Sequence, residues 1–454
     1  MKEFKFKGLL VNKIWQENVS IMIDNDGVIQ SIKNSNNGLG YSDFAIPGFQ
    51  NAHSHSFQYA MAGLAELHDT KPNQNDFWSW RNAMYDLALT INPDQLEDIA
   101  TMLYKEMLRN GYTHVAEFHY LHHDISGNKF NNISENGERL VSAAKKVGIK
   151  ITLIPIFYQM GGFGKKPEEK QRRFISETYK DYIALLEASK KSACQYTNAS
   201  TGIGIHSMRG VIEKDIIHLS EYRRNNTPFH IHVSEQLKEI EDCINHLGQR
   251  PVEWLANNIE LNENYHLVHA THINKKEISK IAKSKANVVL CPSTEGNLGD
   301  GIFPLKEFLS ENGRWSIGTD SHIGLNPLEE IRLLDYGQRL ITHNRNTFGN
   351  NISGDNGSIA IESSFINGKK SMGEDQDVFF QIGQKFDALV ISESHPLINQ
   401  TSFKNLSNTI VYSSDISSYK GTIVNGDWVI REGKHKDENI EANFKSTLKT
   451  LSKR

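Results

Sequence analysis

The chain has 454 residues, of which 38% are hydrophobic and 23% charged, so it is long enough to bury a large core and too apolar for a disordered protein. Its formal net charge of −4 and the lack of a basic block exclude nucleic acid as the main partner. No run of about 18 apolar residues occurs, so we expect no membrane partner.

Two features predict a cytoplasmic protein. Cys194, Cys243 and Cys291 are widely spaced and odd in number, which is typical of reduced thiols rather than of a disulfide framework. Residues 1–27 alternate apolar with polar side chains and lack the continuous apolar core of a signal peptide.

The amino-terminal part of the chain predicts a small β unit followed by repeated βα units. Residues 4–33 contain short strand-like runs separated by turn signals such as DNDG at 24–27. From residue 49 to about 345, β-rich runs alternate with segments of helical periodicity, a pattern typical of a parallel sheet covered by helices. The expected strands end at His55, His119, Phe157, His206, Val233, His269, Cys291 and Asp320. This number of strands favours a (β/α)8 TIM-type barrel over a doubly wound open sheet.

The carboxyl-terminal part returns to β patterning. After a polar stretch near residues 349–375, FDALVI and YKGTIVNGDWVIREGKH predict further strands and a hairpin. We expect both chain ends to form one small β-sandwich. Residues 1–48 with 370–454 would then be a discontinuous β domain, and residues 49–369 the barrel domain.

Side chains at the carboxyl ends of barrel strands belong to one site. His53 and His55 lie two residues apart on an extended strand and can reach one ion, although for this pair alone a solvated strand end is the favoured explanation. His232 and Asp320 end the fifth and eighth strands and would complete a His3Asp set, which favours a metal site. His230 is in phase with His232, so either is a candidate, and we prefer His232 because it is nearer the strand end.

Three residues are candidates for proton transfer beside this metal. His269 ends the sixth strand, Glu235 follows His232 by three residues, and Asp320 is placed to take a proton from bound water. The structural alternatives are a core histidine for His269 and a helix-end carboxylate for Glu235. No lysine ends the fourth strand, so a carbamylated lysine bridging two metals is not available there, and we expect one divalent metal ion.

Substrate recognition falls to the remaining loops. Arg81 and Arg209 are candidates for binding carboxylates, because a guanidinium group can bind two oxygens at once. Either arginine alone is more often a surface or structural residue. Gln58, Tyr120 and His206 are hydrogen-bonding residues near the same rim.

Several long motifs carry a family resemblance. They are PGFQNAHSHSFQYAMAGLAE, FWSWRNAMY, AEFHYLHHD, GIHSMRGV, HIHVSEQ, CPSTEGNLGDGIFPL and GTDSHIGLNPLEEIRLLDYGQRL. With them, the sequence resembles the amidohydrolase superfamily, and within it the formimidoylglutamate deiminase family. The match covers most of the barrel, but Gly296 stands where the family pattern has alanine, and the carboxyl-terminal third is more polar.

This resemblance implies a reaction and a set of roles. The reaction is hydrolysis of N-formimidoyl-L-glutamate, a small substrate with two carboxylates, to N-formyl-L-glutamate and ammonia in histidine degradation. Zinc would bind His53, His55, His232 and Asp320; Glu235 and His269 would move protons; and Gln58, Arg81, Tyr120, His206 and Arg209 would hold the glutamate end. We also expect a homodimer.

Two alternatives stay open. A related deaminase acting on a nucleobase or another cyclic amidine would share the metal ligands but would have no use for two arginines. A non-catalytic scaffold of the same fold would need neither the complete ligand set nor the proton carriers.

Overall fold

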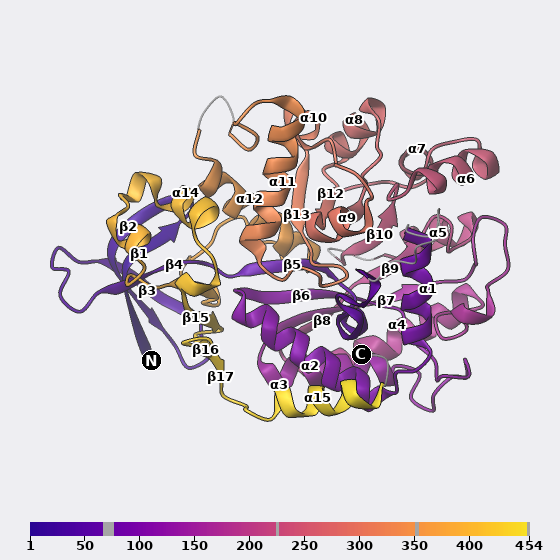
Figure 1. Cartoon of the computed structure of the whole chain (residues 1–454), viewed down its shortest axis with the longest axis horizontal. Coiled ribbons are helices and arrows are strands. Elements are labelled where there is room, and N and C mark those ends of the chain that lie inside the picture. The colour runs from indigo at the N-terminus through magenta and orange to yellow at the C-terminus, as the bar shows by residue number, and fades with distance from the viewer. Residues whose placement is uncertain (67–76, 224–226, 350–353, 452–454) are drawn as a thin grey trace.

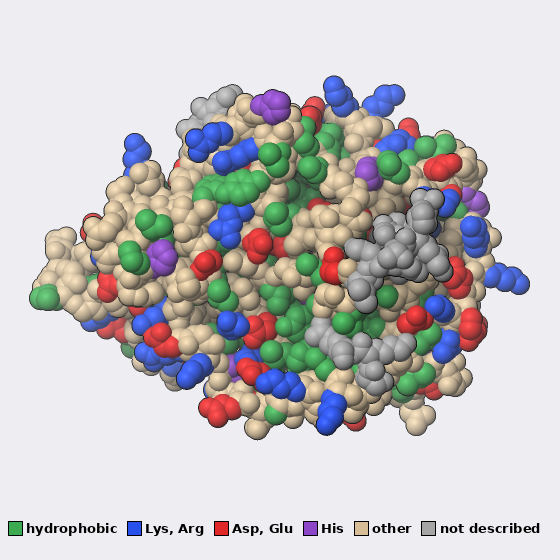
Figure 2. Space-filling view, viewed as in Figure 1, with side chains coloured by type: hydrophobic (Ala, Val, Ile, Leu, Met, Phe, Trp, Pro, Cys, Tyr) green, Lys and Arg blue, Asp and Glu red, His purple; other side chains and the backbone are tan. Residues whose placement is uncertain are grey.

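The computed structural model describes residues 1–66, 77–223, 227–349 and 354–451 (Figure 1). It contains a barrel surrounded by helices. On one side of the barrel lies a sheet whose strands come from the amino-terminal and carboxyl-terminal parts of the chain. No helix among these residues is both long and apolar enough to cross a membrane. On the face seen in Figure 2, lysine and arginine side chains are interspersed with acidic ones.

Eight parallel strands form the barrel: β5 (Phe49–Ser54), β6 (Tyr112–His119), β7 (Lys150–Phe157), β9 (Ile203–Ser207), β10 (Phe229–Val233), β11 (Tyr265–His269), β12 (Asn287–Leu290) and β13 (Arg314–Ile317). A short strand, β8 (Ala199–Thr201), pairs with β7 outside this order. The ring closes where Ser54 pairs with Asp320. There the backbone N–H groups of Thr319 and Asp320 donate to the carbonyl of His53 at 3.1 and 3.0 Å.

The helices are α1 (Phe77–Ala88), α2 (Pro93–Arg109), α3 (Glu135–Val147), α4 (Tyr179–Ala193), α5 (Glu213–Tyr222), α6 (Leu237–Leu247), α7 (Pro251–Asn258), α8 (Lys275–Ser284), α9 (Pro292–Leu298), α10 (Leu305–Ser310), α11 (Pro327–Thr342) and α12 (Asn356–Ser371). Local sequence explains where they begin. Asn92 caps α2 through a capping box with Gln95, and Pro93 occupies the first helical position, where its missing N–H costs nothing. The buried face of α2, including Leu96, Ile99 and Leu103, then packs against the barrel.

Strands from both chain ends form one continuous eight-stranded sheet. They are β1 (Lys2–Val11), β2 (Ile14–Ile23), β3 (Ile29–Asn34), β4 (Ser42–Pro47), β14 (Ala388–Ile391), β15 (Tyr419–Val424), β16 (Asp427–Arg431) and β17 (Lys434–His435). β4 and β14 join the two halves as an antiparallel pair. The remaining helices are α13 (Pro396–Gln400), α14 (Phe403–Ser413) and α15 (Ile440–Thr450).

The predicted fold class is a TIM-type barrel with a small β-sandwich built from both chain ends; the barrel and a separate sheet built from both chain ends are confirmed. Four strands end slightly away from the expected residue, at Ser54, Ser207, Leu290 and Ile317, so that His55, Cys291 and Asp320 lie in the loops that follow. The division into domains of residues 1–48 with 370–454 and of residues 49–369 stays a prediction.

Candidate active site

A cavity lies at the carboxyl ends of the barrel strands. Its walls come from the βα loops and from α1, and it is lined by His55, Gln58, Trp80, Arg81, Met84, Tyr85, Tyr120, Tyr158, His206, Arg209, His232, Glu235, His269, Leu298 and Asp320. Every residue that the sequence placed in the site lines this cavity except His53, which is fully buried directly beside His55 and His232.

Four side chains converge within this site. The Nε2 atom of His53 lies 3.1 Å from Nε2 of His55 and 3.0 Å from Nε2 of His232. Asp320 Oδ1 lies 3.4 Å from Nε2 of His53 and 3.2 Å from Nε2 of His55. All four ligand atoms lie within 4.8 Å of one another, and all four residues are buried.

The hydrogen-bond partners of two of these rings indicate that their Nε2 atoms can bind a cation. Nδ1 of His55 lies 2.9 Å from the carbonyl of Phe118, and Nδ1 of His232 lies 2.9 Å from the carbonyl of His206. Because a carbonyl only accepts, both Nδ1 atoms carry the hydrogen, and each neutral ring then presents a lone pair at Nε2.

The charges of these groups agree with this reading. Burial lowers the pKa of His55 and His232, and it lowers the pKa of His53 to about 3, so the rings are neutral at pH 7. Nε2 of His53 faces the Nε2 lone pairs of His55 and His232 and the carboxylate of Asp320. A single hydrogen on this atom cannot satisfy all three acceptors. Three imidazole nitrogens and one carboxylate oxygen are a ligand set that Zn²⁺ prefers.

His230, the other candidate in the fifth strand, lies away from this cluster. Its Nε2 donates to the carbonyl of Ser371, 2.9 Å away, at the opposite end of the barrel where α12 ends. Successive inward-facing residues of one strand lie at different heights in the barrel interior. Only His232 therefore lies at the carboxyl ends of the strands, beside His53, His55 and Asp320.

His269 lies between three carboxylates. Its Nε2 is 3.9 Å from Glu235 Oε1 and 3.8 Å from Asp320 Oδ2, and its Nδ1 is 3.2 Å from Glu295 Oε1. Burial alone would lower the pKa of His269, but these charges outweigh burial and raise it to about 10. Burial raises the pKa of Glu235 to about 7, although His269 and Arg209 oppose that effect. His269 is therefore protonated at neutral pH, where Glu235 can gain or lose a proton.

Backbone strain is concentrated at the same place. Ser234, His269 and Asp320 have φ angles of 53°, 67° and 46°, in the left-handed region that favours glycine. Such conformations persist where the surrounding structure holds them, and they are enriched at functional sites.

The two arginines stand at the junction of this cavity with a second, outer one. The outer cavity is lined by Arg81, Gly161, Gly162, Phe163, Lys165, Glu168, Arg209, Lys238, Glu239, Asp242, Asn245 and His246. Arg81 Nη2 lies 3.8 Å from Glu168 Oε1, and Arg209 Nη1 lies 3.7 Å from Glu239 Oε2. Each arginine therefore already has one carboxylate neighbour, and because a guanidinium group has five N–H donors, each can bind a further carboxylate.

The other rim residues are held by direct contacts. The Gln58 side-chain amide donates to the Tyr120 hydroxyl at 3.0 Å. The His206 ring stacks on the Tyr158 ring with centroids 4.1 Å apart, and its Nδ1 lies 3.0 Å from the Ser207 hydroxyl. These contacts fix polar groups on the wall between the arginines and the histidine cluster.

Sequence reasoning missed the residues that support this site. Trp80, Tyr85 and Tyr158 line the cavity, although aromatic side chains in a barrel protein are expected in the core. Glu239 and Glu295 lie behind Arg209 and His269. The motif CPSTEGNLGDGIFPL contains Glu295, so its distinctiveness was the one signal that could have indicated this residue.

Comparisons with known proteins agree with the fold. The model of the amidohydrolase family matches residues 44–429. Formimidoylglutamate deiminase from Pseudomonas aeruginosa is 39% identical over 435 residues, which cover 94% of this chain and 94% of the relative. A 5-methylthioadenosine/S-adenosylhomocysteine deaminase from Thermodesulfovibrio yellowstonii is 25% identical over 406 residues, 88% of this chain and 82% of the relative. The crystal structure of an amidohydrolase from Brucella melitensis is 35% identical and gives a TM-score of 0.92, covering 99% of this chain and 100% of that chain.

Proposed function

The chain belongs to the amidohydrolase family, and from this premise we propose that it hydrolyses N-formimidoyl-L-glutamate to N-formyl-L-glutamate and ammonia, as a step of histidine degradation. The observation that carries the proposal is one cavity that combines two arginines with a His3Asp cluster and a Glu–His pair. A nucleobase deaminase would have no use for both arginines.

We propose that His53, His55, His232 and Asp320 hold one divalent metal ion, and that this ion is zinc. A bound ion of this kind lowers the pKa of a coordinated water to about 7 and so supplies hydroxide at neutral pH.

The chain's own groups then manage the protons. In the overall reaction the oxygen of water joins the formimidoyl carbon, the bond from this carbon to the terminal nitrogen breaks, and both hydrogens of the water end on that nitrogen as ammonia. Asp320 Oδ2 faces His269, and His269 Nε2 faces Glu235, so these three groups form a short path along which protons reach the leaving nitrogen.

The arginines orient the substrate. Because Arg81 and Arg209 line both cavities, we place the two carboxylates of the substrate at their junction and the formimidoyl group against the histidine cluster. Gln58, Tyr120 and His206 lie between the two ends, where they can bond to the polar groups of the glutamate chain.

An ammonia-release assay tests this proposal. Formimidoylglutamate should be turned over, whereas guanine, cytosine and S-adenosylhomocysteine should not. Because a hydrogen bond to a charged group contributes about 1.5–3 kcal/mol, Arg209→Ala and Arg81→Ala should each lower kcat/KM by about ten- to a hundredfold with bound metal unchanged. If both variants kept the wild-type kcat/KM, the carboxylate assignment would be wrong. A purified protein with less than about half an equivalent of metal and no ammonia release would refute the enzyme itself.

A further inference from the structure

We infer that Glu239 is a positioning residue that ties the carboxylate-binding end of the site to its proton-transfer end. The inference rests on the proposed function, because it takes Arg209 as a binding residue and Glu235 as a proton carrier. Glu239 is the third residue of α6, and only 2% of it is exposed.

Both oxygens of the Glu239 carboxylate have partners. The backbone N–H of Ser234 donates to Oε1 at 3.2 Å, and the backbone N–H of Glu235 donates to Oε2 at 3.2 Å. The same Oε2 atom lies 3.7 Å from Nη1 of Arg209. One carboxylate therefore contacts both the backbone that carries Glu235 and the guanidinium group that faces the substrate.

The segment held by Glu239 begins directly after the metal-ligand strand. β10 ends at Val233, and Ser234 has a φ angle of 53°, so the chain turns sharply between His232 and Glu235. Such a turn in a non-glycine residue needs partners that hold it. The two N–H groups that Glu239 accepts are those of the turn itself, so the direction of Glu235 depends on this carboxylate.

A helix-end role alone does not explain the arrangement. A glutamate at the third helical position ordinarily accepts from the N-cap residue, which in α6 is Gln236. Glu239 instead reaches past Gln236 to the two residues before it, and it also meets Arg209, which follows β9. A charge buried beside a guanidinium group orients that group and compensates its charge.

The test compares Glu239→Gln with Glu241→Gln, an exposed glutamate of the same helix. Glutamine keeps the size of the side chain and one oxygen for the backbone N–H groups, but it removes the charge beside Arg209. In Glu239→Gln, the KM for formimidoylglutamate and the Kd for N-formyl-L-glutamate measured by calorimetry should rise about ten- to a hundredfold, with metal content unchanged. Glu241→Gln should stay within about twofold of wild type on both constants.

A double-mutant cycle separates positioning from a merely structural role. In an Arg209→Ala background, Glu239→Gln should change the Kd for N-formyl-L-glutamate by less than about threefold, because the effect of Glu239 on binding passes through Arg209. An equal loss in both backgrounds, a wild-type Kd in Glu239→Gln, or no binding by the wild type would overturn the inference. If Glu239→Gln does not fold, Glu239→Asp, which keeps the charge but is too short for all three contacts, takes its place under the same criteria.

Because the Kd is measured without turnover, failure of the positioning role can be distinguished from failure of the proposed reaction. If the wild type released no ammonia from formimidoylglutamate while the pattern of Kd values held, the proposed reaction would be wrong and the positioning role would stand. Normal ammonia release with equal losses in both backgrounds would overturn the positioning role alone.

Discussion

At the scale of single residues, position along a strand proved more informative than residue type. His53, His55, His232 and Asp320 could be grouped from the sequence because parallel strands of a barrel end at one rim. The side chains that hold this group could not be predicted in the same way. Glu295 reaches His269 from the first turn of α9, and the direction of a helix that follows a loop is not encoded in a short motif.

Replacing Glu295 tests how His269 is oriented. Glu295 Oε1 accepts the N–H of Cys291 at 2.9 Å and lies 3.2 Å from Nδ1 of His269, so Nε2 of the ring is turned toward Glu235 and Asp320. In Glu295→Gln we expect kcat to fall about tenfold or more, because a positioned acid–base group contributes about 10²–10⁴ to the rate, while KM changes less than about threefold. Steady-state kinetics with Glu307→Gln, an exposed glutamate of α10, as the control would decide; a kcat equal to that of the control would show that Glu295 does not orient the ring.

At the scale of elements, the site depends on how the barrel closes. The segment after β13 must approach β5 so closely that Asp320 reaches His53 of β5 and His55 directly after it. A glycine, Gly318, stands at this approach. A Cβ atom there would lie 2.7 Å from Cβ of His53 and 3.0 Å from Sγ of Cys291, distances that the packed strands cannot relieve by moving a flexible side chain.

Adding one methyl group at Gly318 should therefore disturb both folding and metal binding. Overpacking of a core costs about 1–3 kcal/mol, so Gly318→Ala should lower Tm, and the displaced His53 should reduce the metal bound per chain. Gly296→Ala is the matched control, because a Cβ atom at Gly296 meets no heavy atom of the described residues within 4 Å apart from its chain neighbours and the backbone of its own helix. Alanine at this position is also the residue expected from the family pattern, and it favours the helix by about 1 kcal/mol. If Gly318→Ala and Gly296→Ala had the same Tm and the same metal content per chain, the close approach of Gly318 to His53 would not be needed for barrel closure or metal binding.

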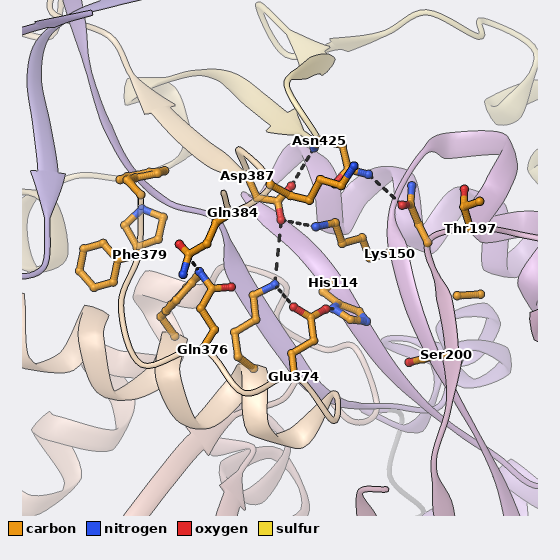
Figure 3. A pocket seen from close by; sticks show the side chains of 17 residues that line it. His114, Lys150, Thr197, Ser200, Glu374, Gln376, Phe379, Gln384, Asp387 and Asn425 are labelled. Carbon is orange, nitrogen blue, oxygen red and sulfur yellow. Dashed lines mark hydrogen bonds and ion pairs between the residues drawn. The ribbon is translucent and has the colours of Figure 1, made fainter. Parts of the chain in front are cut away.

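At the scale of the whole molecule, buried charges join the barrel to the sheet from the chain ends. Lys150 of β7 donates to Asp387, which precedes β14, and Lys369 of α12 lies 2.8 Å from Glu374 and 4.0 Å from Asp387 (Figure 3). His114 Nδ1 lies 3.2 Å from the same Glu374. This cluster occupies the end of the barrel opposite the active site, where features of such barrels serve stability. The sequence alone does not reveal it, since lysines and acids far apart in a chain are ordinarily read as solvated.

Breaking this cluster should cost stability but leave the chemistry intact. Asp387→Asn leaves Lys150 buried without its counter-charge, which costs about 3–5 kcal/mol, whereas Asp375→Asn removes an exposed partner of Lys370 at a cost of about 1 kcal/mol or less.

Lys150 and Lys369 outweigh burial and lower the pKa of Asp387 below its ordinary value of 3.8. A carboxyl group whose pKa is lower in the folded state stabilises the protein fully above that ordinary value, and this stabilisation is lost as the pH falls through the folded-state pKa. The difference in Tm between wild type and Asp387→Asn should therefore be constant near neutral pH and shrink in acid. The kcat/KM of Asp387→Asn at 25 °C should stay within about twofold of wild type, because the active site lies at the other end of the strands. A difference that grew in acid would mean that Asp387 is not ionised in the folded protein.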